Sequence, residues 1–161
     1  MHKYQILIEY VGTTFVGWQI QKKGNSIQKN IQNILSKLLK EKVKIYGSGR
    51  TDTGVHALEQ SAHFECINSI KNIKKLVISL NFFLNKKNIS ILQIKKKKLD
   101  FHARYSAKKR SYIYLIRNDV AQSVINYNRE WYIRKTLDIF LMRRGAKKFE
   151  GMHDFSTFRA S

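Results

Sequence analysis

Residues 46–57 read Tyr46-Gly47-Ser48-Gly49-Arg50-Thr51-Asp52-Thr53-Gly54-Val55-His56-Ala57, and the rest of the sequence is arranged around them. Three glycines within eight residues let the backbone turn sharply and let another molecule approach closely, because glycine has no Cβ. One carboxylate, Asp52, and one guanidinium, Arg50, lie two positions apart in the same stretch. Apolar and polar residues alternate on both sides, so the stretch is a loop between two strands. Its composition favours an active-site loop, although a solvated turn also uses glycine and aspartate.

The segments on either side of this loop predict the fold. Alternating residues indicate strands, and apolar residues at helical spacing indicate two amphipathic helices, the first with Ser26 as its N-cap. In chain order the segments are a strand at 4–10, a helix at 26–40, strands at 43–46 and 61–66, a helix at 73–84 and a strand at 89–92. This order predicts an α+β fold of the ferredoxin-like (split βαβ) type, a mainly antiparallel sheet with helices on one face. The other face is then free for a ligand or a second sheet.

Large aromatic residues also occur outside this framework. Residues 11–19 form a loop with two glycines, in which burial preference predicts that Phe15 and Trp18 fill the core rather than stack on bases. Farther along, residues 112–115 predict a strand with the tyrosines Tyr112 and Tyr114 on its outer face and two aliphatic residues on its core face. A third helix is predicted over residues 137–149, and strand-like alternation follows Gly151 up to the last residue.

The lysine run at residues 95–98 is predicted to be a solvated connection and is the best candidate for a boundary. It divides the sequence into an N-terminal α+β subdomain, residues 1–95, which holds the central loop, and residues 96–161. We expect the later residues to be the truncated start of a second α+β subdomain.

Charge and composition point to a polyanionic partner. The 161 residues contain 31 Lys and Arg against 11 Asp and Glu, a formal net charge of +20, which in a protein of this size is typical of nucleic-acid binding. Between residues 101 and 114 aromatic residues alternate with cations, a pattern that suits stacked bases and phosphates. The single cysteine, Cys66, excludes an internal disulfide and a multi-cysteine zinc site. With no apolar run of about 20 residues and no signal peptide, we expect a cytoplasmic protein without a membrane span.

Several known chemistries do not fit the central loop. A P-loop requires Lys and then Ser or Thr after its last glycine, and here Val55 and His56 follow. The deaminase signature needs a Pro-Cys-x-x-Cys segment, which a chain with one cysteine and no proline lacks. A shared metal on His56, His63 and Glu65 has no further ligands at suitable spacing, so no metal site is predicted. A Ser-His-Asp arrangement of Ser48, Asp52 and His56 lacks a nucleophile elbow. A carboxylate held ionised by a nearby arginine fits covalent or general-base catalysis better.

Residues 49–57 resemble the catalytic motif of the TruA family of tRNA pseudouridine synthases. Three further segments resemble the family in order and spacing: Tyr10-Val11-Gly12 with Phe15-Val16-Gly17-Trp18-Gln19, then Phe101-His102-Ala103-Arg104, and finally His153-Asp154-Phe155 with Phe158-Arg159. Because members of this family continue well past the point that matches Ser161, the chain resembles the N-terminal part of a family member. The resemblance implies the pseudouridine synthase fold with its second half incomplete.

The resemblance also implies an activity and its residues. Asp52 is expected to be the catalytic nucleophile, attacking either C6 of a uracil or C1′ of its ribose. Arg50 is expected to fill the gap left by the flipped base and to contact phosphate, Tyr112 to stack on the target base, and Thr51 and Arg104 to complete the substrate-binding set. The implied substrate is the anticodon stem-loop of tRNA at positions 38–40, with no cofactor and no metal. A homodimer is implied if the family's C-terminal part is present.

Two alternatives stay open at this level. The first is a catalytically inactive RNA-binding fragment of such an enzyme, because the family's C-terminal part contributes an arginine that pairs with the catalytic aspartate. The second is a basic structural protein of the ribosomal type, which only the net charge of +20 supports.

Overall fold

The computed structural model describes residues 1–158, and Arg159 of the fourth motif lies outside the described residues, as does the end of the alternation predicted after Gly151. The chain forms two compact units, Met1–Tyr112 and Ile113–Ser161. Each unit is an independent assembly of strands and helices, so each is described by itself.

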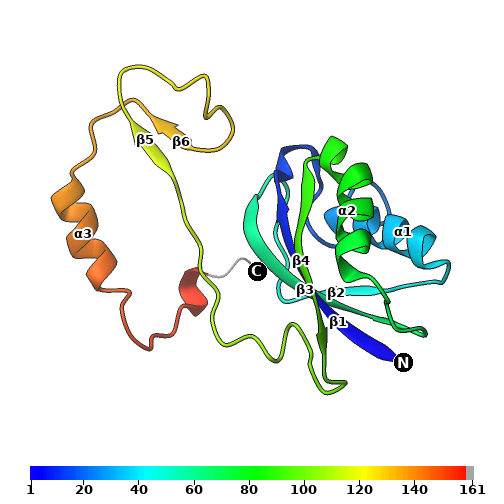
Figure 1. Cartoon of the computed structure of the whole chain (residues 1–161). Helices are drawn as coiled ribbons and strands as arrows, with labels where there is room; N and C mark the ends of the chain where they lie inside the picture. The colour runs from blue at the N-terminus through cyan, green and yellow to red at the C-terminus, as the bar shows by residue number, and fades with distance from the viewer. Residues whose placement is uncertain (159–161) are drawn as a thin grey trace. The chain divides into compact units, whose positions relative to one another are not determined.

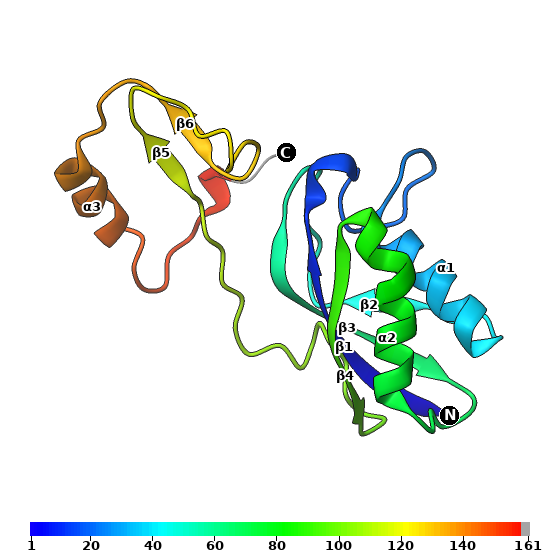
Figure 2. The ribbon, with the colours of Figure 1, turned by 45° about the horizontal axis from the view of Figure 1, so that its top comes forward.

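The first unit has the predicted order of elements. They are β1 (His2–Tyr10), α1 (Ile27–Leu39), β2 (Ile45–Gly47), β3 (Ala57–Cys66), α2 (Ile73–Leu84) and β4 (Ile89–Lys97). The four strands form one sheet in the order β2-β3-β1-β4, and every neighbouring pair is antiparallel. Both helices cover the same face of this sheet (Figures 1 and 2). The α+β, ferredoxin-like architecture predicted from the sequence is therefore confirmed.

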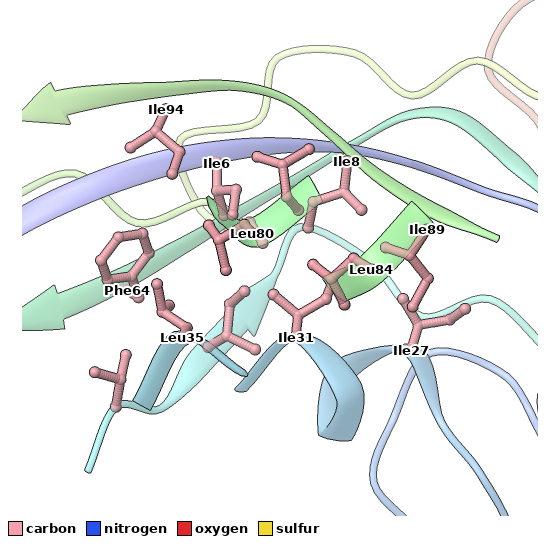
Figure 3. Close-up of a cluster of buried hydrophobic side chains, with 14 of the residues drawn as sticks. Ile6, Ile8, Ile27, Ile31, Leu35, Phe64, Leu80, Leu84, Ile89 and Ile94 are labelled. Atoms are coloured by element: carbon pink, nitrogen blue, oxygen red, sulfur yellow. The ribbon is translucent and has the colours of Figure 1, made fainter. Parts of the chain in front are cut away.

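The core lies between the sheet and the two helices. Alternate residues of β1 point toward the helices, and Tyr4, Ile6, Ile8 and Tyr10 are each at most 2% exposed. Figure 3 shows side chains from the strands and from both helices meeting in this layer. Burying one such aliphatic side chain contributes roughly 1.5–3 kcal/mol. The helices also begin where the sequence predicts, since the Ser26 hydroxyl accepts a hydrogen bond from the Lys29 N–H. The predicted burial of Phe15 and Trp18 is confirmed, as each is 2% exposed.

β4 is longer than the sequence predicts. It continues through Lys97, and Lys95, Lys96 and Lys97 pair with the first residues of β1. The prediction of a solvated connection at residues 95–98 is therefore wrong for its first three lysines. An edge strand tolerates lysines because its side chains reach water, and their charge discourages pairing with another sheet. Along the chain, the boundary between the two compact units falls between residues 112 and 113 rather than inside β4. A second α+β subdomain over residues 96–161 stays a prediction.

The second unit contains two short strands and one helix. They are β5 (Ile116–Asn118), β6 (Trp131–Ile133), which pairs with it in parallel, and α3 (Ile139–Lys147), which begins after the N-cap Asp138. The third helix is thus confirmed with shorter bounds. None of residues 113–158 is buried. No helix within residues 1–158 is long and apolar enough to cross a membrane.

Two predicted strands are absent. Residues 111–115 form no strand, and Ile113 and Leu115, predicted to face the core, are 71% and 57% exposed. A strand needs a partner for its backbone groups, and strand pairing begins only at Ile116. The alternation after Gly151 also gives no strand as far as residue 158, and its last described residues form a 3-10 turn, Ser156–Phe158.

Candidate functional site

The central loop begins on a backbone that is fixed to β3. The Ser48 N–H donates a hydrogen bond of 2.8 Å to the Ser61 carbonyl. The Gln60 side chain donates a bond of 2.6 Å to the Gly49 carbonyl and accepts one of 3.3 Å from the Ser48 hydroxyl. Ser48 is buried. The residues directly before Arg50 therefore have a defined position.

The loop at residues 11–19 supports the central loop from the other side. The Trp18 N–H donates to the Thr51 carbonyl at 3.0 Å, and the Gly12 N–H donates to Nδ1 of His56 at 3.0 Å. The two backbones are so close that a Cβ on Gly17 would lie 2.5 Å from the Thr51 carbonyl oxygen. A Cβ on Gly12 would lie 2.0 Å from the Val55 carbonyl oxygen. The segment at residues 10–19 and the central loop, which are far apart in the sequence, thus pack backbone against backbone on either side of Asp52.

Thr51 is tied to the protein interior. Its hydroxyl lies 2.9 Å from the hydroxyl of Tyr10, which is 2% exposed. Burial raises the pKa of Tyr10, and its hydrogen bond with Thr51 partly opposes that rise. The tyrosine is therefore a neutral hydroxyl at physiological pH, and it orients the threonine directly beside Asp52.

Asp52 and Arg50 are both exposed. The ion pairs within residues 1–158 are Lys3 with Glu65 and Arg117 with Asp119, so Arg50 does not pair with Asp52. The predicted role of Arg50 in holding this carboxylate ionised is therefore not realised by a direct contact. The carboxylate is accessible to a large ligand, and the cation is free to contact that ligand instead.

A polar cleft of about 670 Å³ lies beside the loop. Its lining contains three guanidinium groups, of Arg50, Arg104 and Arg110, and no carboxylate from residues 1–158. Of the predicted site residues, the structure brings Arg50 and Arg104 together in this cleft. Asp52, Thr51 and Tyr112 are not among its lining residues, and Tyr112 is 70% exposed at the end of the first unit.

Four rings contact one another in series beside the cleft, and those of Tyr46, His102 and Tyr105 line it. Tyr46 stacks on His63, His63 meets His102 edge-on, and His102 is tilted against Tyr105. Ring centroids are 5.1 Å apart between Tyr46 and His63, 4.5 Å between His63 and His102, and 4.5 Å between His102 and Tyr105. The Ala103 N–H donates to Nδ1 of His63 at 3.1 Å. Burial, and then the charges of His102 and Lys3, lower the pKa of His63 to about 4, while Glu65 opposes this shift. His63 is therefore neutral at pH 7 and carries its proton on Nε2.

The metal considered for His56, His63 and Glu65 has no site here. His63 accepts a hydrogen bond from the third motif, and Glu65 pairs with Lys3 at 3.0 Å. Within residues 1–158, no group of three His, Cys, Asp or Glu side chains is placed to hold a metal ion.

Arg110 connects the third motif to the central loop. Its Nη2 donates to the Ser48 carbonyl at 2.9 Å and to the Arg104 carbonyl at 3.4 Å. Sequence reasoning missed Gln60. It placed Arg110, Gly12 and Gly17 inside suggestive segments but assigned them no individual role. The glycines of residues 11–19 carried a signal, because glycine is common where two backbones approach closely. Gln60 carried none, because it meets the central loop only in the folded structure. Arg110 lies in the aromatic and cationic stretch at residues 101–114, but its bond to the Ser48 carbonyl, 62 positions away, could not be predicted from that pattern.

Comparison with known proteins gives consistent results. A family model described as tRNA pseudouridine synthase matches residues 6–106. The chain is 61% identical to a tRNA pseudouridine synthase A of Pelagibacter ubique (strain HTCC1062) over 161 residues, which cover 100% of this chain and 65% of that protein. It is 44% identical to the protein of the same name from Ehrlichia canis (strain Jake), over 98% of this chain and 64% of that protein. The chain thus spans slightly less than two thirds of the length of these relatives.

Proposed function

The chain belongs to the tRNA pseudouridine synthase family, as its four motifs predict, and we therefore propose that it isomerises uridine to pseudouridine in tRNA with Asp52 as the nucleophile. One observation carries this proposal: Asp52 is exposed on a loop that hydrogen bonds and close backbone contacts hold from two sides. A fixed, accessible carboxylate beside a cationic cleft suits attack on a nucleotide, because preorganised geometry lowers the barrier.

The proposed reaction needs no net change in atoms or electrons. The carboxylate of Asp52 attacks C6 of the uracil or C1′ of the ribose, and the bond between N1 and C1′ breaks. The uracil rotates and rejoins the ribose through C5, and the bond between Asp52 and the substrate breaks, which restores the free carboxylate. The proton that C5 loses is balanced by the proton that N1 gains. The reaction is redox-neutral, so the proposal includes no cofactor and no metal.

The other predicted residues have roles in this proposal. Arg50 occupies the space left by the flipped uridine and contacts phosphate, and Tyr112 stacks on the target base. Thr51, oriented by Tyr10, supports Asp52, and Arg104 binds the RNA backbone from the cleft. Unstacking a base costs a few kcal/mol, which an inserted cation and a stacking ring return in part.

The proposed substrate is the anticodon stem-loop of tRNA at positions 38–40, bound by its shape and phosphates. The net charge of +20 supports this partner. The proposal further includes a homodimer, formed with the remaining family segment, and a cytoplasmic location.

The decisive experiment measures pseudouridine in an unmodified tRNA transcript after incubation with this chain. Asp52→Asn keeps the size of the side chain and removes its charge, so we expect formation to fall to background. Asp100→Asn is the matched control, because Asp100 is also an exposed aspartate of the first unit. Equal product from the wild type and Asp52→Asn would remove Asp52 as the nucleophile.

A second function is favoured by the length of the chain, which covers 65% or less of the relatives cited above. In this alternative the chain binds tRNA and does not isomerise it, because a further segment completes the active site. It predicts salt-dependent binding without product. Turnover by the isolated chain would exclude it.

A further inference from the structure

We propose that the cleft beside the central loop binds a second nucleotide of the RNA, adjacent to the target uridine, with its base stacked on Tyr105 and its phosphate held by Arg104 and Arg110. This inference rests on the proposed function, since it assigns a subsite to the same RNA substrate. It gives a binding role to a turn and a ring that the reaction at Asp52 does not use.

The charge of the cleft selects an anion. Three arginines line it, with no carboxylate among the lining residues that the structure describes, and a guanidinium binds phosphate through paired, charge-assisted hydrogen bonds. Arg110 uses Nη2 for its bonds to the Ser48 and Arg104 carbonyls. Since a guanidinium carries five N–H donors, the remaining donors of Arg110 are available for phosphate oxygens. A cleft of about 670 Å³ is also within the usual range for small ligands.

The rings that line the cleft select a planar group. Tyr105 is 78% exposed, although one side of its ring contacts His102 at a centroid distance of 4.5 Å. The guanidinium of Arg104 lies 6.0 Å from the Tyr105 centroid. A ring supported from behind, next to a cation, offers stacking and charge together, and this pairing is typical of single-stranded nucleic acid sites.

The turn that carries Tyr105 is already ordered. The Ser106 N–H donates to the His102 carbonyl at 2.7 Å, and the His102 N–H donates to the Ser106 hydroxyl at 3.1 Å. Ala103 is 2% exposed and bonds to His63. The turn therefore loses little conformational entropy when a ligand stacks on Tyr105.

The occupant of the cleft is a neighbour of the target rather than the target itself. Arg50 lines the cleft, whereas Asp52, two residues later, does not. The reacting uridine must reach the carboxylate of Asp52, so the nucleotide in the cleft lies beside it along the strand.

The experiment is a coupling test between protein and RNA. Stem-loop RNAs carrying one abasic nucleotide at each position flanking the target are titrated against wild type and Tyr105→Leu at fixed salt. We expect one abasic position to weaken wild-type binding by about 5- to 100-fold, the range that stacking on one aromatic ring provides. Tyr105→Leu should lose a similar factor with intact RNA and almost nothing further with that abasic RNA.

Two variants serve as controls. Tyr105→Phe keeps the ring and should bind within about twofold of wild type, and Tyr127→Leu removes another exposed tyrosine and should leave binding unchanged. Thermal unfolding checks that each variant folds. If the fold-losses in affinity caused by Tyr105→Leu and by each abasic position multiply, the two changes act independently. That result would refute the proposed subsite and leave the proposed function intact. Failure of the wild type to bind any RNA would overturn both.

Discussion

Gly17 is a position at which the support of the central loop is sensitive to an added side chain. Its φ of +105° is a conformation that other residues rarely adopt, and its Cα faces the backbone of Thr51 and Asp52. We expect Gly17→Ala to lower the free energy of unfolding by at least about 2 kcal/mol, because backbone strain of this kind costs about 1–3 kcal/mol before any clash is counted. Urea denaturation measures this loss, and the pseudouridine assay should show reduced turnover.

Gly24→Ala is the control for this change. Gly24 has a similar φ of +97°, but an added Cβ would meet the side chain of Val16 instead of the central loop. It should cost stability without displacing Asp52. Equal turnover in the two variants would show that the contact at Gly17 does not position the loop.

His63 makes stability depend on pH. Its pKa of about 4 in the folded protein lies below the usual 6.5, so the unfolded chain binds the proton first as the pH falls. The contribution is complete above about pH 6.5 and is lost as the pH falls toward 4. We expect the free energy of unfolding to fall by about 1–2 kcal/mol between pH 7.5 and 5 from this residue.

His63→Asn tests this expectation. The asparagine carbonyl can still accept the bond from the Ala103 N–H, and the side chain does not titrate. The variant should be less stable at pH 7.5 because it loses ring contacts, and its stability should change less with pH. Parallel pH profiles for the two proteins would contradict the assignment.

The central loop could be singled out from its residue types alone, and its catalytic role stays a prediction. The contacts that support this loop were only partly predictable. The type and spacing of Arg50 and Asp52 point to chemistry without any knowledge of the fold. His63 could be placed only on a polar strand face, because its partner Ala103 lies forty positions later and comes near it through tertiary folding. The outward position of Tyr112 rested on a strand that does not form.

Among the elements, those with a strong local signal were predictable. β1 alternates cleanly, and the predicted N-cap Ser26 accepts the expected backbone bond. Asn72, which was not predicted as a cap, does the same for α2. The extension of β4 through Lys97 was not predictable, because pairing with β1 outweighs the low strand propensity of lysine. Residues 112–115 show the reverse case. Their polar and apolar residues alternate as in a strand, but no partner strand pairs with them, so no strand forms.

The turn at residues 101–106 depends on Arg110 for one of its links to the central loop. Arg110→Ala removes the bonds to the Ser48 and Arg104 carbonyls, and a hydrogen bond from a charged group contributes about 1.5–3 kcal/mol. We expect backbone amides of this turn to exchange hydrogen about 5- to 50-fold faster, measured by mass spectrometry. Lys109→Ala, a change at the adjacent exposed cation, should leave exchange unchanged. Identical exchange in both variants would mean that Arg110 does not hold the turn.

For the whole molecule, the distribution of buried residues separates the two units. The hydrophobic core uses residues between Tyr4 and Ile94, and none of residues 113–158 is buried. We expect a fragment of residues 1–112 to unfold cooperatively in urea, with a midpoint close to that of the full chain. A fragment of residues 1–94 should be less stable, because it uncovers His63 and Lys3. Non-cooperative unfolding of the longer fragment would refute the expectation.

The position of β1 in the sheet has a consequence for biosynthesis. Among the four strands of its sheet, β1 leaves the ribosome first, yet it lies between β3 and β4 and must wait for both. Residues are added at about 5–20 per second, so β1 spends several seconds of translation without its neighbours. The aliphatic face of the nascent strand is exposed during this interval, and α1, which emerges next, is the earliest segment able to shield it.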